Sequence, residues 1–210
     1  MQRSLARRTT LAFVLGLGAA TAFLPAAFAQ SSGQPERVRG TIESLEDTTL
    51  TVKSREGDSV AITLAPGYRI TGIAKASVAD IKEGDFVGVA SVPGSSGGAD
   101  AVEVLIFPKA MAGTGEGSYP WDLEPDSTMT NATVSNKVEN ADGRELTLTY
   151  PSGEKTVSLP EGIPIVTFAE ATKADLEPGA PVFVPAQKAS DGSISTAFVV
   201  VGNQGVVPPM

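Results

Sequence analysis

The residues best suited to chemistry gather in one stretch, 108–130, of the 210-residue chain. Tyr119 and Trp121 flank Pro120 there, and aromatic side chains so placed can form a platform for a sugar ring or a Pro-rich peptide. The same side chains can instead plug the open end of a β-barrel, since burying a large apolar side chain stabilises a fold by about 2–3 kcal/mol. The sequence favours the plug and keeps a ligand platform at Tyr119 and Trp121 as the alternative.

Three acidic residues of the same stretch could bind a metal ion. Asp122, Glu124 and Asp126 alternate along the chain and carry the hard oxygen ligands that calcium prefers. Their spacing lacks the central glycine and the distal glutamate of an EF-hand loop. A solvated acidic loop is therefore the simpler interpretation, and a calcium-like site is the weaker hypothesis.

Nothing in the sequence selects a catalytic group. Histidine and cysteine are absent, which removes the commonest general base, the Ser–His and Cys–His pairs and the thiolate metal ligands. A single S-x-x-K string spans Ser152 to Lys155, but the S-D-N and K-T-G elements that accompany it in serine enzymes are missing. We predict a non-enzymatic protein without a cofactor. A hydrolase using paired carboxylates is the remaining enzymatic alternative, because acidic residues are abundant.

The N-terminus has the features of an export signal. A start with three arginines precedes the apolar run 11–24, and a small-x-small pattern ends at Ala29. We predict that 1–29 is a signal peptide cleaved between Ala29 and Gln30, which places the protein in the periplasm or outside the cell. Thr10 replaces the aromatic residue of twin-arginine signals, which favours the general secretion route. No later apolar run is long enough to span a membrane.

The charge of the chain restricts its partners. Its net charge is −8, and removal of the three signal arginines makes it −11. Such acidity argues against a nucleic-acid partner, because phosphate binding needs clustered Lys and Arg. A protein, a peptide or a saccharide is the expected ligand.

An internal repeat defines the organisation of the chain. Residues 76–89 and 171–184 share six identical positions at an offset of 95. Each copy has a capping hydroxyl, Ser77 or Thr172, and a turn glycine followed by an apolar strand. A repeat of this kind predicts two similar small domains.

The patterns predict an all-β fold of two tandem OB-like barrels, at 37–107 and 131–202. Each repeat has five strand-like runs with a short helical turn between the third and fourth, which is typical of a small closed barrel. The stretch 108–130 is then an ordered connector and 203–210 a tail. A unit of about 70 residues builds only a marginal core, so the two should pack together, with a ligand cleft between them.

The passage from Asp80 to Val87, D-I-K-E-G-D-F-V, and the connector from Gly113 to Thr133 resemble a family of uncharacterised bacterial exported proteins with tandem OB-like barrels. The second copy departs from the passage, with Ala180 in place of the second aspartate. Some members carry the label metal ABC transporter permease. A permease needs several membrane helices, so the resemblance implies at most a soluble accessory of metal transport.

Together these features predict an exported periplasmic binding or structural module that is not an enzyme and whose ligand is unknown. A soluble carboxylate-based accessory for a calcium-like ion is the alternative hypothesis. The oligomeric state is left open by the sequence.

Overall fold

The computed structural model describes residues 33–94, 97–140, 143–203 and 205–208. The chain divides into a unit of residues 1–31 and a compact unit of residues 32–210, and only the second is described below. The predicted signal peptide and its cleavage site, Ala29–Gln30, lie outside the described residues. Within the described part, no helix has the length and apolar character needed to cross a membrane.

The fold is all-β, as the sequence predicts. Three single turns of 3-10 helix interrupt the described strands, namely η1 (Val78–Asp80), η2 (Lys109–Met111) and η3 (Lys173–Asp175). The strands are β1 (Gln34–Glu46), β2 (Thr49–Ser54), β3 (Ser59–Lys75), β4 (Phe86–Pro93), β5 (Ala99–Ile106), β6 (Gly117–Pro120), β7 (Thr128–Asn140), β8 (Gly143–Tyr150), β9 (Gly153–Ser158), β10 (Ile165–Ala169), β11 (Pro181–Lys188) and β12 (Ile194–Gly202).

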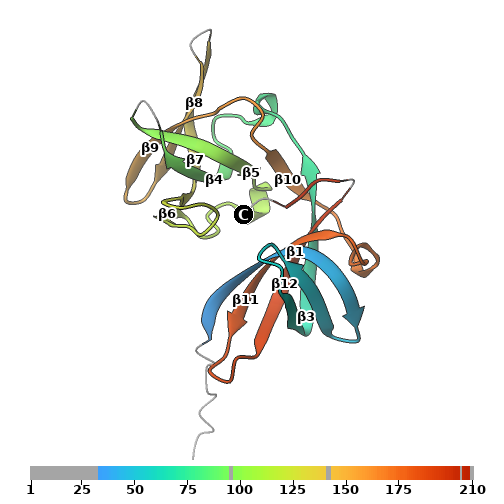
Figure 1. Cartoon of the computed structure of the whole chain (residues 1–210). Helices are drawn as coiled ribbons and strands as arrows, with labels where there is room; N and C mark the ends of the chain where they lie inside the picture. The colour runs from blue at the N-terminus through green and yellow to red at the C-terminus, as the bar shows by residue number, and fades with distance from the viewer. Residues whose placement is uncertain (1–32, 95–96, 141–142, 204, 209–210) are drawn as a thin grey trace, which may run out of the picture. The chain divides into compact units, whose positions relative to one another are not determined.

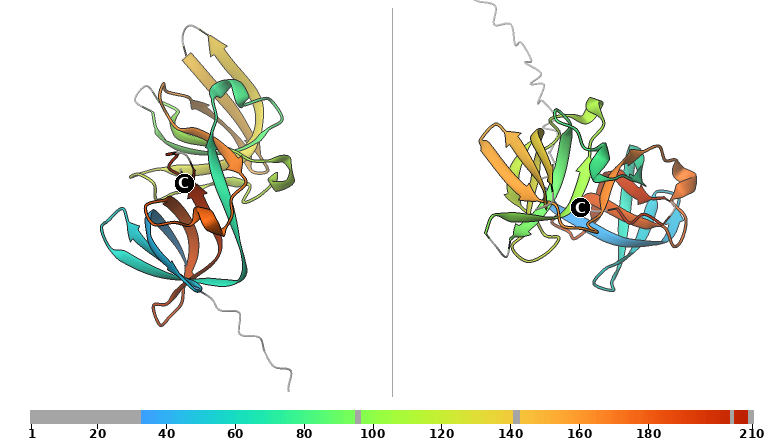
Figure 2. Two further views of the ribbon diagram at one scale, coloured as in Figure 1. Left: turned by 90° about the vertical axis from the view of Figure 1, so that its right-hand side faces the viewer. Right: turned by 90° about the horizontal axis from the view of Figure 1, so that it is seen from above.

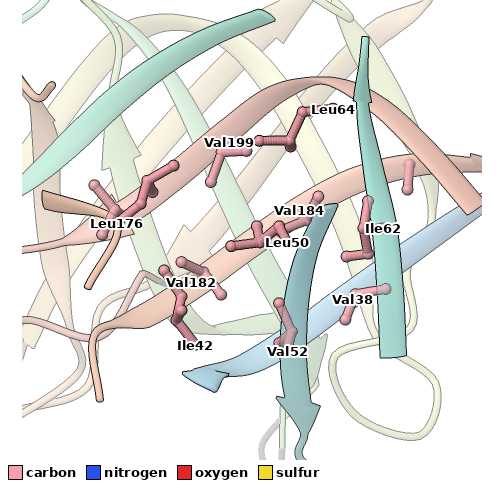
Figure 3. Packing of buried hydrophobic residues seen from close by; sticks show 12 residues of the cluster. Val38, Ile42, Leu50, Val52, Ile62, Leu64, Leu176, Val182, Val184 and Val199 are labelled. Carbon is pink, nitrogen blue, oxygen red and sulfur yellow. The ribbon is translucent and has the colours of Figure 1, made fainter. Parts of the chain in front are cut away.

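Five strands close into a barrel. The hydrogen-bonded order is β12–β11–β1–β2–β3, and a parallel pairing of β12 with β3 completes the ring (Figure 1). Apolar residues at every second position, such as Leu50 and Val52 of β2, point inward because side chains alternate along a strand. Figure 3 shows them packed with Val184 and Val199 of the last two strands.

A second strand group has its own core. Its order is β5–β4–β7–β8–β9, and β9 meets β5 again at one residue pair, Asp100 with Ser158. Leu146 and Leu148 of β8 pack there against Val87 and Val89 of β4. β10 lies between β3 and β5 and so joins this group to the barrel.

The barrel and the second strand group each take strands from both repeats. The barrel combines β1–β3 with β11 and β12, and the second group combines β7–β9 with β4 and β5. This pairing corrects the expectation that 37–107 and 131–202 each close a barrel from consecutive strands. The reason lies in β3, whose 17 residues run on past the barrel and carry the chain that follows into the other group (Figure 2).

The two repeats thus exchange their last two strands, and this strand exchange has local two-fold symmetry. Ile73 of β3 pairs directly with Phe168 of β10, and these residues are 95 positions apart, the offset of the repeat. The pairing of Val104 with Ile165 is matched at the same offset by that of Val199 with Ile70. Contacts that recur with the two partners interchanged are the mark of a two-fold axis. The two repeats thus form an intertwined pair within one chain.

The connector packs where the two groups meet. β6 pairs with β7, and Trp121 joins a cluster that includes Phe183 of the barrel and Leu105 of the second group. Phe107 bridges Phe86 and Phe168, with ring centroids 5.3 and 5.5 Å away in edge-to-face geometry. The pairing of β6 and the packing of Trp121 thus fix the connector, and the Phe107 contacts fix the strand end just before it.

Candidate ligand cavity

A cavity of about 660 Å³ lies where β3 leaves the barrel. Its walls come from the end of β3 and the segment 75–78, from the loop 160–164 leading into β10, and from the tail segment 205–208. Pockets of 300–1,000 Å³ at the junction of packed units are typical of small-molecule sites. Size and place therefore make this cavity the first candidate for a ligand site.

The cavity wall is aliphatic. Ile163 and Ile165 contribute from the approach to β10, Val78 from η1, Leu123 from the connector and Val206 from the tail. Among the described residues that line it there is no aromatic side chain. Such a wall offers apolar contact to a chain or branched group and no ring face for stacking.

Three cationic side chains also line the cavity. Arg55 comes from the β2–β3 turn, Lys75 from the end of β3 and Arg144 from β8. The Arg144 guanidinium lies 3.9 Å from the carboxylate of Glu161, whose side chain is 97% exposed. An ion pair so exposed to solvent contributes little to stability. One acidic residue, Glu103 of β5, also lines the cavity and is itself buried. The lining therefore has a net charge of +2 in a chain of net charge −8.

The two-fold related position makes an internal comparison possible. A second cavity, of about 520 Å³, is lined by Ile70, Thr71, Phe168 and the segment 169–172. At the offset of 95, Lys75 of the first cavity corresponds to Glu170 of the second. Glu170 is the only charged residue in that lining, as far as the described residues show. The two repeats thus supply similar backbone and opposite charge.

Tyr119 and Trp121 lie in a packed contact. Their ring centroids are 6.0 Å apart at an interplanar angle of 65°, and the Arg37 guanidinium lies 4.0 Å above the indole. The indole Nε1 is buried and has no hydrogen-bond partner within the described residues. A small cavity of about 50 Å³ adjoins these rings. Trp121 packs against the cluster shared by the two strand groups, and both the plug and the ligand platform stay predictions.

The three acidic residues of the connector are not brought together. Asp122 accepts hydrogen bonds from Arg39, at 2.8 Å, and from Arg37, at 3.4 Å. Desolvation raises the pKa of Asp122, but the hydrogen bond from Arg39 and the two cationic charges outweigh it and hold that pKa below its ordinary value. Across the described part of the chain, no three acidic side chains, Glu124 and Asp126 included, form a group that could hold a metal ion.

Lys155 of the S-x-x-K string has partners elsewhere in the fold. Its ammonium donates hydrogen bonds to the hydroxyls of Ser91, at 2.9 Å, and Thr128, at 2.7 Å, while Ser152 lies in an exposed turn. Burial lowers the pKa of Lys155. Ser91 is 1% exposed and so is closed to a substrate. The cluster therefore forms a polar contact across three strands.

The cationic cavity was missed from the sequence, because Arg55, Lys75 and Arg144 come from distant segments without a shared motif. One signal was available, namely the opposite charges at the repeat-equivalent positions 75 and 170. No family model matches the chain, and no curated protein or solved structure matches it either.

Proposed function

We propose that this protein is an exported, non-enzymatic binding module whose ligand site is the cavity beside Lys75. The observation that carries the proposal is the cavity itself, with an aliphatic wall and a cationic surround in an acidic chain. Convergence of a few polar groups on an apolar pocket is the usual form of a ligand site. Export rests on the signal features of 1–29, and a periplasmic location is the natural compartment for such a module.

We further propose that the scaffold is a pair of OB-like barrels that have exchanged strands. Two features support this description: the barrel has five strands, and the short turn η3 precedes β11, its fourth strand by repeat position. The second group repeats this order with η1 before β4. OB-like barrels bind ligands on exposed strand faces and loops, so the scaffold suits a binding role.

A neutral lipophilic dye tests whether the cavity takes up ligands. Nile red is titrated into the mature protein and its fluorescence recorded, with saturable binding at one site as the expected result. Ile163→Trp fills the cavity from its wall and should reduce the dye's affinity at least about tenfold, since the volume for contact is lost. Val138→Trp is the matched control, because Val138 is 38% exposed and does not line the cavity.

Two outcomes contradict this proposal. One is the absence of saturable dye binding to a folded mature protein. The other is an equal loss of binding in the Ile163→Trp and Val138→Trp proteins, which would place the dye site elsewhere. Thermal unfolding of all three proteins shows whether each variant is folded and keeps the comparison valid.

A further inference from the structure

We infer that the cavity beside Lys75 selects an aliphatic chain that ends in a carboxylate. The inference rests on the proposed binding function and adds the chemical class of the ligand. It depends on the charge of the lining, on the chemistry of the wall and on the comparison with the two-fold related cavity.

The charge of the lining points to an anion. Arg55, Lys75 and Arg144 outnumber the one acidic residue of the cavity, although the chain as a whole has more acidic than basic residues. Neither Arg55 nor Lys75 forms an ion pair within the described residues, although the charge of Arg55 also acts on the adjacent Glu56 and, alongside hydrogen bonds, helps to lower its pKa. A concentration of one sign of charge in a cleft raises the local concentration of ligands of the opposite sign.

The two-fold related cavity shows that this charge is not imposed by the fold. Residues 75–77 and 170–172 occupy equivalent places, and the capping hydroxyl is retained as Ser77 and Thr172. Lys75 is nevertheless replaced by Glu170. The capping residues explain how each turn forms, whereas the side chain at position 75 or 170 has no part in the cap. The reversed charge distinguishes one cavity as a site for anions.

The wall determines the rest of the ligand. Ile163, Ile165 and Val166 present branched aliphatic surface, and the described lining has no aromatic ring on which a sugar or a flat heterocycle would stack. An aliphatic chain gains favourable free energy from such a wall in proportion to its buried area. Of the ligands expected from the sequence, a saccharide is therefore disfavoured.

The exposed position of two of the cations orients the ligand. Glu103 is 4% exposed, whereas Lys75 and Arg55 are exposed. A carboxylate is attracted by the exposed cations, so it should stay at the rim. The aliphatic part then lies against the wall, out of water. A ligand with its charge at one end matches this division.

Three probes with the same eight-carbon chain test the inference. Octanoate, octanol and octylammonium are titrated into the mature full-length protein by calorimetry. We expect octanoate to bind most tightly, octanol at least about tenfold more weakly, and octylammonium least of all. Raising the salt concentration should weaken octanoate binding and leave octanol binding nearly unchanged, because ions screen only the charged contact.

A pair of charge reversals provides the matched control. Lys75→Glu should weaken octanoate binding about tenfold or more and leave octanol binding unchanged. Glu170→Lys makes the opposite change at the equivalent position and should leave octanoate binding at the first cavity unchanged. Both residues are exposed, so both variants should fold, and thermal unfolding verifies this.

Each outcome has a definite meaning. Equal affinity for octanoate and octanol, or equal effects of Lys75→Glu and Glu170→Lys, overturns the inference. So does saturable Nile red binding without any octanoate binding, although the proposed binding function then stands. Failure of Nile red and of all three probes removes the inference and the proposed function together.

Discussion

Arg39 is a buried cation that contacts the connector. Its side chain is 8% exposed, and its guanidinium bonds Asp122 and lies 5.6 Å from the centre of the Trp121 ring. A cation this buried needs compensation by a nearby carboxylate and by aromatic faces. Arg37 covers the outer face of the same indole. These contacts make the connector part of the packed structure.

Asp122→Asn should therefore destabilise the protein. Breaking a buried ion pair costs about 3–5 kcal/mol, but the Asp122 side chain is 48% exposed, so we expect a loss of about 1–2 kcal/mol. Because Trp121 is the only tryptophan, its emission should shift to the red as the connector loosens. Denaturant unfolding followed by fluorescence measures both effects. Asp126→Asn is the control on the same loop, and an equal effect there would contradict the assignment.

The same ion pair predicts a pH dependence. The pKa of Asp122 in the folded protein lies below its ordinary value of 3.8, so the stabilisation is complete above that value and is lost as pH falls through the folded pKa. The difference in unfolding free energy between wild type and Asp122→Asn should thus be constant well above pH 3.8 and shrink as the pH is lowered further below 3.8. A constant difference across the range would show that the charge of Asp122 is not its cause.

At the scale of elements, the two repeat-equivalent 3-10 turns, η1 and η3, share one carboxylate cap. The Asp80 carboxylate accepts from the backbone N–H and the hydroxyl of Ser77, at 2.9 and 2.7 Å, and Asp175 does the same for Thr172, at 2.7 and 3.0 Å. In both turns the carboxylate thus satisfies a backbone N–H that the turn leaves unpaired, and in η3 the Thr172 hydroxyl also accepts from the backbone N–H of Ala174, at 3.3 Å. Their local chemistry is why Ser77 and Thr172 could be recognised as caps from the sequence.

Equivalent caps should respond equally to the same substitution. Hydrogen bonds from Ser77 lower the pKa of Asp80, and those from Thr172 lower the pKa of Asp175, so both caps contribute stability above pH 3.8 that is lost as pH falls through the folded pKa. Asp80→Asn and Asp175→Asn should reduce stability at pH 7 by similar amounts and lose that effect at low pH. Thermal unfolding at both pH values measures this. A loss in only one variant would contradict the equivalence of the turns.

The strands were predictable, whereas their partners were not. Alternation in Leu50–Lys53 and Leu146–Tyr150 specifies a strand with one buried face, and the structure has β2 and β8 there. The same buried face fits a fourth strand from either repeat, because both repeats carry similar valines at 87–89 and 182–184. The exchange depends on the unbroken length of β3, which no local pattern reports. The cavity is lined by strands that the exchange brings together, so it could not be predicted from the sequence either.

At the scale of the whole molecule, the exchange changes what the connector does. In a simple tandem arrangement, the connector would hold together two sheets that are each complete. Here the segment before the connector supplies β4 and β5 to the second group, and the segment after it supplies β11 and β12 to the barrel. The two halves of the chain are thus held together by the hydrogen bonds and cores of both the barrel and the second strand group, whether or not the connector is intact.

Cleavage of the connector should consequently leave the halves associated. Residues 112–116 are exposed, so a protease site inserted after Ala112 can be cut in the native protein. The two fragments should elute together in size-exclusion chromatography and separate only in denaturant, because separation removes two of five strands from the barrel and two of five from the second strand group. The unfolding midpoint should also become dependent on protein concentration, as for any two-chain complex. Fragments that separate under native conditions, each still folded, would show that the repeats close independently and that the strand exchange is wrong.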